Sequence, residues 1–257
     1  MSQTNDADAA RGAGSAPSGT VIELDTLDSK KGRQQILKMA EVKLLDDEEL
    51  NTRKIIYPGM PNRGVLNTFR ELRTKLVQRA QKKNFVLMVS SVSDSGGGSF
   101  TALNMGASFA LDPAKTAVLI DCNLYDPSVE SLLTIKPDYG LTDYLEDPGL
   151  DIDDIIYSSG VPRLRIVPIG SHVDSASELF SSLRMEEMIQ TMKSRYADRY
   201  IVLDVPSLDT SADAQILVNV CDLAILVVPY GRVTQDQVLA GVEAIGEEKL
   251  AGVIFNN

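Results

Sequence analysis

Short runs of mostly apolar residues alternate along the chain with longer segments in which apolar residues recur every three or four positions. The short runs are typical of strands buried on both faces of a sheet, and they occupy residues 85–89, 116–120, 164–169, 200–203, 223–228 and 251–255. The periodic segments predict helices at residues 64–82, 102–110, 178–196 and 234–247, and another helix that ends at 217–220. Strands that alternate with helices favour an α/β fold with a mostly parallel central sheet and helices on both faces.

The N-terminal part of the chain lacks this regular pattern. Residues 1–30 are rich in small and polar residues and are predicted to form a disordered tail. Residues 31–61 mix charges with scattered Leu and Ile, which predicts a linker with room for a short helix. Residues 62–257 are predicted to form the folded domain, in which 138–159 contribute short helices and loops.

A glycine-rich loop at residues 90–99 follows the first predicted strand and precedes a helix. Strand, glycine-rich turn and helix form the layout of a phosphate-binding loop, whose backbone N–H groups and helix N-terminus hold an anion. The Walker A pattern also needs a lysine directly before its Ser or Thr, whereas Gly98 precedes Ser99 here and Val92 replaces the first glycine. Taken alone, the loop fits a plain flexible turn equally well.

Two aspartates strengthen the case for a phosphate site. Asp121 and Asp204 each end a predicted strand, as the glycine-rich loop does. Ligands of parallel sheets bind at the carboxyl ends of the strands, so these groups are expected to converge there. Two carboxylates beside a glycine-rich loop predict a site for magnesium and a phosphate group.

Composition narrows the classes of function. The net charge of −11 disfavours sequence-independent binding to nucleic acid. The one histidine, His172, argues against histidine metal sites and histidine-based catalytic triads. No segment approaches the roughly 18 apolar residues of a membrane span, and Cys122 and Cys221 lie in or beside apolar runs, as reduced core thiols do in the cytosol. We therefore expect a cytoplasmic protein whose association with the inner face of the membrane, if any, depends on a partner.

With these motifs assembled, residues 62–257 resemble the bacterial tyrosine autokinases of capsule and exopolysaccharide systems, within the deviant-Walker P-loop ATPases. The resemblance rests on an oligomerisation motif at 67–73, the Walker A loop and helix at 90–104, a second aspartate motif at 118–128, a Walker B strand at 201–206 and a final strand at 252–256.

The resemblance implies a P-loop NTPase-like fold, ATP or ADP with Mg²⁺ as cofactor, a homo-oligomer, and an inner-membrane polysaccharide co-polymerase or chain-length protein as partner. It implies catalytic roles for Asp121 and Asp204, and magnesium ligation by Ser99, Asp121 and Asp204. The nucleotide-binding residues it implies are Gly96, Gly97, Gly98, Ser99, Phe100, Thr101 and Asn256. The subunit-contact residues it implies are Asn67, Arg70 and Arg73.

Several positions depart from the family pattern. Gly98 replaces the Walker A lysine, and Phe100 replaces the next Thr, where it would add bulk near the α-phosphate. Asn123 and Tyr125 replace an Asp and an Arg of the second motif, and Asn67 replaces the Glu of the oligomerisation motif. The sequence ends at Asn257 without a tyrosine-rich tail, and Arg70, Arg73 and Arg184 are the arginines considered as substitutes for the lysine.

These departures favour a pseudokinase that acts as an interaction module in exopolysaccharide assembly. Nucleotide binding stays open, because Ser99, Asp121 and Asp204 would either hold a weakly bound nucleotide or serve only the fold. An active tyrosine kinase with an unusual loop is one alternative. A partitioning-type ATPase is another, although residues 92–94 lack the additional lysine of that group.

Overall fold

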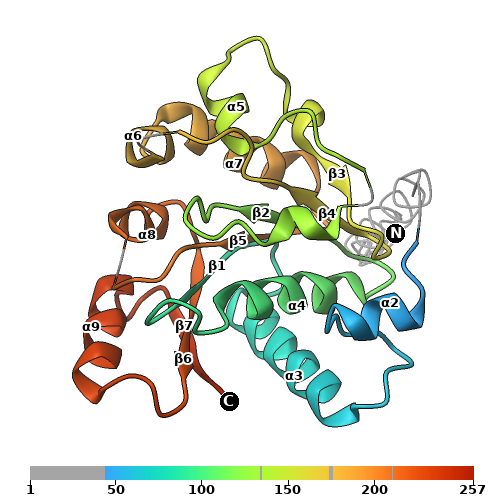
Figure 1. Cartoon of the computed structure of the whole chain (residues 1–257), viewed down its shortest axis with the longest axis vertical. Helices are drawn as coiled ribbons and strands as arrows, with labels where there is room; N and C mark the ends of the chain where they lie inside the picture. The colour runs from blue at the N-terminus through green and yellow to red at the C-terminus, as the bar shows by residue number, and fades with distance from the viewer. Residues whose placement is uncertain (1–43, 134, 174–175, 210) are drawn as a thin grey trace, which may run out of the picture.

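The computed structural model describes residues 44–133, 135–173, 176–209 and 211–257, and a seven-stranded sheet forms their centre (Figure 1). The strand order is β3-β4-β2-β5-β1-β6-β7, and every neighbouring pair is parallel except β3 with β4. The strands are β1 (Val86–Ser91), β2 (Thr116–Asp121), β3 (Tyr157–Ser158), β4 (Leu164–Val167), β5 (Arg199–Asp204), β6 (Leu223–Pro229) and β7 (Leu250–Asn256). The predicted α/β fold with a mostly parallel sheet is confirmed.

Helices cover both faces of this sheet (Figure 1). One face packs against α2 (Asp47–Thr52), α3 (Arg63–Arg79) and α4 (Gly98–Ala110). The other face packs against α5 (Leu141–Glu146), α6 (Ala176–Phe180), α7 (Leu183–Arg195), α8 (Ala212–Val218) and α9 (Gln235–Ile245). Two 3₁₀ turns, η1 (Val129–Leu132) and η2 (Ile152–Ile155), complete the connections. Side chains alternate between the two cores along the central strands β1, β2, β5 and β6, which is why these strands read as continuous apolar runs.

The segment predicted as a linker contributes to the core where it is described. Apolar side chains between residues 45 and 60 are buried in the cluster beneath α3 and α4, among them Ile55 and Ile56. The Ile56 N–H donates to the buried Asn104 amide oxygen of α4 (2.8 Å). The folded unit therefore begins before residue 62, while the tail at 1–30 and most of the predicted short helix lie outside the described residues.

Two local predictions differ from the structure. Residues 178–196 form two helices, because the chain turns at Ser181 and Ser182 caps α7 by accepting a hydrogen bond from the Met185 N–H. Strand β3 is only two residues long, too short for a periodic signal, and it pairs antiparallel with β4 at the sheet edge. Both cysteines are buried and free, as predicted.

The sheet register brings three polar strand ends together. Val89 of β1 lies opposite Asp204 of β5, and Asp204 lies opposite Asp121 of β2. The loop that follows β1 therefore starts beside both aspartates. Among the described helices, none is long and apolar enough to cross a bilayer.

Candidate nucleotide and metal site

The glycine-rich loop joins the carboxyl end of β1 to the amino end of α4. After β1, the Val92 N–H donates to the Val227 carbonyl of β6 (2.9 Å), and the Gly96 N–H donates to the Ser93 carbonyl (3.2 Å). The helix begins at Gly98, and the first N–H groups of a helix have no intrahelical partner. The loop thus offers the backbone donors and the positive helix end that bind an anion.

The three glycines of the loop differ in whether the structure has room for a side chain at their positions. Gly97 has a φ of 91°, and a Cβ atom there would lie 2.2 Å from the Asn256 Nδ2 atom. A Cβ atom on Gly96 would lie 2.8 Å from the Ser93 carbonyl oxygen. At Gly98 the nearest contact of a Cβ atom would be 3.4 Å, an ordinary van der Waals distance. The backbone therefore requires glycine at 96 and 97, but the position of the missing lysine accepts a side chain.

Asp121 and Asp204 lie side by side at the ends of adjacent strands, and both are completely buried. The Asp121 Oδ1 atom accepts a hydrogen bond from the Asn123 N–H (3.0 Å). Asp121 Oδ2 and both carboxylate oxygens of Asp204 have no hydrogen-bond partner among the residues that the structure describes. Such unsatisfied buried oxygens are costly, so they point to a cation or protons that complete them.

The electrostatics of the pair agree with its geometry. Burial raises the pKa of Asp121 to about 7, while the Asn123 N–H limits the rise. Burial and the neighbouring charge of Asp121 raise the pKa of Asp204 well above its ordinary value. The Ser99 hydroxyl approaches Asp204 and opposes part of that rise, without reaching full hydrogen-bond geometry. Without a cation, the pair therefore holds at least one proton at neutral pH.

The oxygen donors of this cluster fit a hard divalent cation such as Mg²⁺. The structure brings together all three residues predicted to hold it, since Ser99 faces Asp204 and Asp204 adjoins Asp121. In the described part of the chain, no group of three His, Cys, Asp or Glu side chains is arranged to hold a metal. The remaining ligands of Mg²⁺ would therefore come from phosphate oxygens or water.

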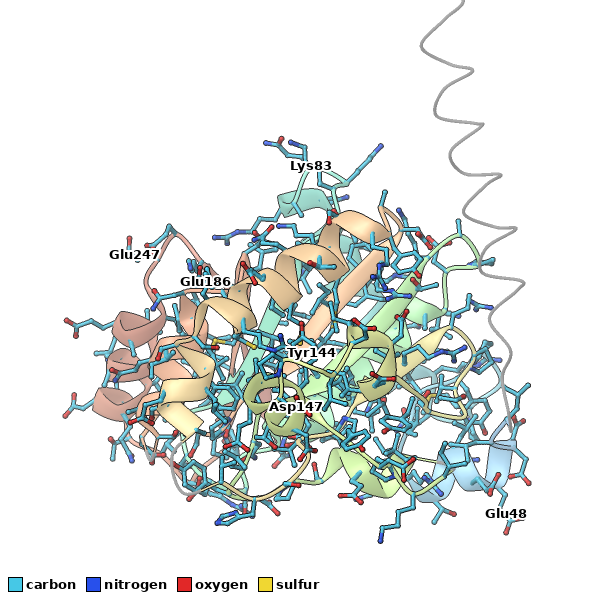
Figure 2. All side chains as sticks on the ribbon, turned by 90° about the horizontal axis from the view of Figure 1, so that it is seen from above. Glu48, Lys83, Tyr144, Asp147, Glu186 and Glu247 are labelled. Carbon is cyan, nitrogen blue, oxygen red and sulfur yellow. The ribbon has the colours of Figure 1, made fainter. Side chains whose placement is uncertain are left out.

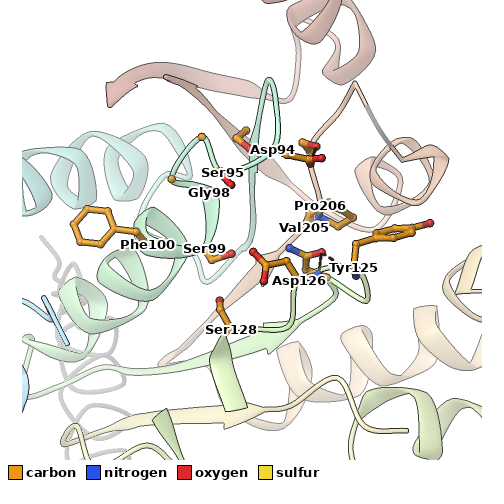
Figure 3. A pocket seen from close by; sticks show the side chains of 15 residues that line it. Asp94, Ser95, Gly98, Ser99, Phe100, Tyr125, Asp126, Ser128, Val205 and Pro206 are labelled. Atoms are coloured by element: carbon orange, nitrogen blue, oxygen red, sulfur yellow. Dashed lines mark hydrogen bonds between the residues drawn. The ribbon is translucent and has the colours of Figure 1, made fainter. Parts of the chain in front are cut away.

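A cavity of about 610 Å³ opens over the loop (Figure 3). Its floor is the loop from Ser95 to Phe100, and its walls come from the segments that follow β2 and β5. The wall residues are Asn123, Tyr125, Asp126, Ser128, Val205, Pro206 and Ser207. No lysine or arginine is among the described residues that line the cavity. In the described part of the chain, the cavity is thus lined by the carboxylates of Asp94 and Asp126 and by backbone donors, without a side-chain cation.

Three predicted nucleotide-binding residues have other contacts. The Phe100 ring packs edge-on against Phe69 of α3 (6.2 Å between centroids) and points away from the cavity in Figure 3, so its bulk does not fill the predicted α-phosphate position. The Thr101 hydroxyl is buried and donates to the Gly97 carbonyl (2.8 Å). The Asn256 Nδ2 atom donates to the Gly96 carbonyl (3.1 Å), so Asn256 stabilises the conformation of the loop.

The arginines considered as substitutes for the lysine lie elsewhere. Arg73 Nη1 donates to the Ser108 carbonyl near the end of α4 (2.7 Å). Arg184 donates to three backbone carbonyls, including that of Asp147, and its guanidinium stacks on Tyr144 at 4.1 Å. Tyr144 and Asp147 are labelled in Figure 2. Asn67 and Arg70 line a shallow groove along α3. Arg73 and Arg184 are therefore held by the fold, and Arg70 lies on the surface of α3.

Sequence reasoning missed two contacts at the rim of the cavity. The Ser207 hydroxyl donates to the Asp94 carboxylate, which links the loop to the segment after β5. The Tyr125 hydroxyl donates to Asp213 of α8 (3.2 Å), and the Tyr125 side chain is 71% exposed. Neither contact has a local sequence signal, because the partners are separated by 113 and 88 residues, respectively.

Comparison with known proteins gives the chain clear relatives, although no family model matches it. It is 32% identical over 194 residues to the tyrosine-protein kinase CpsD of Streptococcus agalactiae serotype III, covering 73% of this chain and 80% of that protein. It is 30% identical over 194 residues to the tyrosine-protein kinase YwqD of Bacillus subtilis, covering 73% and 79%.

Solved structures agree in fold. The kinase domain of the Escherichia coli tyrosine kinase ETK superposes with a TM-score of 0.71 at 20% identity, over 88% of this chain and 92% of that domain. The VpsO kinase domain superposes with a TM-score of 0.65 at 25% identity, over 75% and 95%. Because these two sequence relatives are at least 30% identical and share most of their length with it, the chain belongs to the bacterial tyrosine-protein kinase family.

Proposed function

We propose that this protein is a catalytically impaired member of the family that binds a nucleotide weakly and acts as an interaction module in capsule or exopolysaccharide assembly. The observation that carries the proposal is the composition of the cavity wall. The loop donors remain, and Asp121 and Asp204 lie buried beside the loop, while Gly98 occupies the lysine position and no described residue that lines the cavity is cationic. A site of this composition favours metal binding over stabilisation of a phosphoryl group.

Each retained residue has a defined task in such a site. The N–H groups at the start of α4 bind phosphate oxygens, and Ser99, Asp121 and Asp204 hold Mg²⁺. When bound, Mg²⁺ neutralises phosphate charge. Asp204 and Asp121 would bind the metal only in their deprotonated forms, so nucleotide affinity would rise with pH. With Asn123 in place of a family aspartate, no further carboxylate is offered from that position.

Loss of the lysine removes a charge that normally stabilises the transferring phosphate. Removing one preorganised donor of this kind costs roughly two decades or more in rate. We therefore expect no detectable phosphotyrosine on the purified protein after incubation with Mg-ATP, as measured by mass spectrometry, with Streptococcus agalactiae CpsD as the positive control. Phosphotyrosine on the wild-type protein would favour the alternative, an active kinase with an unusual loop, which the names of the relatives support.

The variant Gly98→Lys tests the effect of the missing lysine on nucleotide affinity. The backbone at Gly98 accepts a Cβ atom with ordinary contacts, so this variant should fold. Calorimetric titration is expected to give a wild-type Kd for Mg-ATP weaker than about 1 μM, and Gly98→Lys is expected to bind at least about tenfold more tightly, because a lysine adds a charge-assisted contact to phosphate. Gly98→Ala is the matched control, since it adds the Cβ atom without the charge. Equal affinity of Gly98→Lys and Gly98→Ala would contradict the proposal.

The expected partner is an inner-membrane polysaccharide co-polymerase, and the protein would act at the inner face of the membrane through it. Relatives named as tyrosine-protein kinases of Cps and Wzc type support this assignment. A homo-oligomer would use α3, where Asn67 and Arg70 line an accessible groove. Co-purification of the chain with a co-polymerase expressed from the same host tests the partner. Loss of self-association in Arg70→Glu would support a subunit contact on α3.

A further inference from the structure

A cation reaches the phosphate-binding loop from a part of the chain that no family motif covers. Arg232 lies in the turn between β6 and α9, and its Nη1 atom donates to the carbonyl oxygen of Ser95 (3.5 Å). Ser95 is one of the residues that line the cavity. Figure 1 shows this turn at the same edge of the sheet as the loop between β1 and α4. The positive charge that is missing at Gly98 is thus available at the rim of the loop.

The turn that carries Arg232 is fixed by the backbone. The Tyr230 N–H donates to the Asn256 carbonyl (2.8 Å), and the Arg232 N–H donates to the Pro229 carbonyl (3.3 Å). Gly231 takes the φ of 70° that this tight turn needs. Helix α9 then starts with a capping box formed by Thr234 and Gln237. Arg232 therefore starts from a defined position next to the loop, although its own side chain is exposed.

The Arg232 side chain makes few contacts with the rest of the protein. Its one hydrogen bond among the described residues is at the long limit for such contacts, and no described carboxylate pairs with it. A guanidinium has five N–H donors, and a phosphate group is a stronger acceptor than a backbone carbonyl. Exchange of the Ser95 carbonyl for a phosphate oxygen is therefore favourable, and it requires only rotation of an exposed side chain.

We propose that Arg232 binds the phosphates of the nucleotide and replaces the charge of the absent loop lysine. This inference rests on the nucleotide binding proposed above and adds a specific residue to it. It also explains how a cavity that is lined by carboxylates and carries no lining lysine or arginine in the described residues can accept a polyanion.

The test is a calorimetric titration of the full chain with Mg-ATP. Arg232→Ala is expected to weaken binding by about tenfold, the usual size of one charge-assisted hydrogen bond, whereas Arg232→Lys retains most of the affinity. Arg79→Ala is the matched control, because Arg79 is also exposed and donates to one backbone carbonyl, that of Glu248 (3.0 Å). The charge argument further predicts that Arg232→Ala weakens binding less in a Gly98→Lys background than in the wild-type protein, because either cation can serve the phosphates and the two changes are then not additive.

Three results are decisive. If Arg232→Ala binds as well as Arg79→Ala does, Arg232 has no role and the inference is overturned, while the proposed function stands. If Arg232→Ala weakens binding but neither Arg232→Lys nor Gly98→Lys compensates, the residue acts through the shape of the turn and the inference again fails. If the wild-type protein binds no Mg-ATP, the proposed function fails first and the role of Arg232 fails with it.

Discussion

The two halves of the site differ in how closely their residues follow the family pattern. The carboxylate half, Asp121 and Asp204 at the ends of β2 and β5, retains both acids. Within the described part of the chain, three of its four oxygens have no hydrogen-bond partner. The loop half, residues 95–99 between β1 and α4, retains its backbone path but has Gly98 in place of the lysine. Side chains of Ser91 and Asn256 and an exposed arginine hold the loop carbonyls instead.

This contrast separates residues that the fold itself requires from residues whose presence implies a bound ligand. The carboxylates of the first half carry an electrostatic cost, because burial without a cation raises their pKa values. Stability alone does not favour such a pair, so its presence argues for a bound cation. In the second half, Gly96 and Gly97 are required by the backbone and would persist without any ligand. The carboxylate half is therefore the stronger indication of function.

The largest expected effect is a loss of stability as pH rises. The folded-state pKa of Asp121 is about 7, above its ordinary value of 3.8, so the folded state binds more protons between these values. Stability from this group is fully present below about pH 4 and is lost as pH rises through 7, by up to about 4 kcal/mol. Urea unfolding across this range with a chelator present measures the loss.

The variant Asp121→Asn/Asp204→Asn should flatten this pH dependence. The exposed pair Glu186→Gln/Glu187→Gln is the control with the same change in charge. Added Mg²⁺ should raise the stability of the wild-type protein more at pH 8 than at pH 5, since only the deprotonated carboxylates bind the metal. An unchanged pH profile in the double Asn variant would mean that the carboxylate half contributes no more than the loop half.

The next effect separates the two kinds of glycine within the loop half. Gly97→Ala places a side chain on a backbone with a φ of 91° and should cost roughly 1–3 kcal/mol. Gly98→Ala should be neutral or stabilising by up to about 1 kcal/mol, since it adds a Cβ atom to a helix with ordinary contacts. Thermal unfolding followed by circular dichroism compares them, and equal Tm values would show that the loop relaxes freely around residue 97.

The smallest expected effects are changes in stability and assembly on α3, which lies outside both halves of the site. Arg73→Ala removes the hydrogen bond to the Ser108 carbonyl and should lower the stability of the monomer by about 1 kcal/mol. Arg70→Ala should leave monomer stability unchanged and weaken any assembly by about 0–1 kcal/mol, the usual range for exposed charges. Light scattering at low and high salt, combined with urea unfolding, separates the two. A stable ring that is indifferent to salt and to Arg70→Ala would place the interface elsewhere.

The amino-acid sequence by itself determined the architecture of this protein. Continuous apolar runs that alternate with amphipathic segments are compatible with few folds, and the parallel sheet followed from them. The convergence of the glycine-rich loop with Asp121 and Asp204 was also predictable, because parallel strands place their carboxyl ends at one edge. The absence of the lysine was also evident from the sequence, because Gly98 directly precedes Ser99.

Only the tertiary structure decided where the side chains near these motifs point. Phe100 packs on α3, the Thr101 hydroxyl donates to the Gly97 carbonyl at the start of α4, and Asn256 bonds to the loop. Motif spacing does not encode these partners. The same holds for Arg232, which is 137 residues from Ser95 in the chain and reaches it through the sheet order that sets β6 beside β1. Sequence patterns report the burial and period of a segment, whereas contacts between distant side chains depend on how the packed elements bring them together.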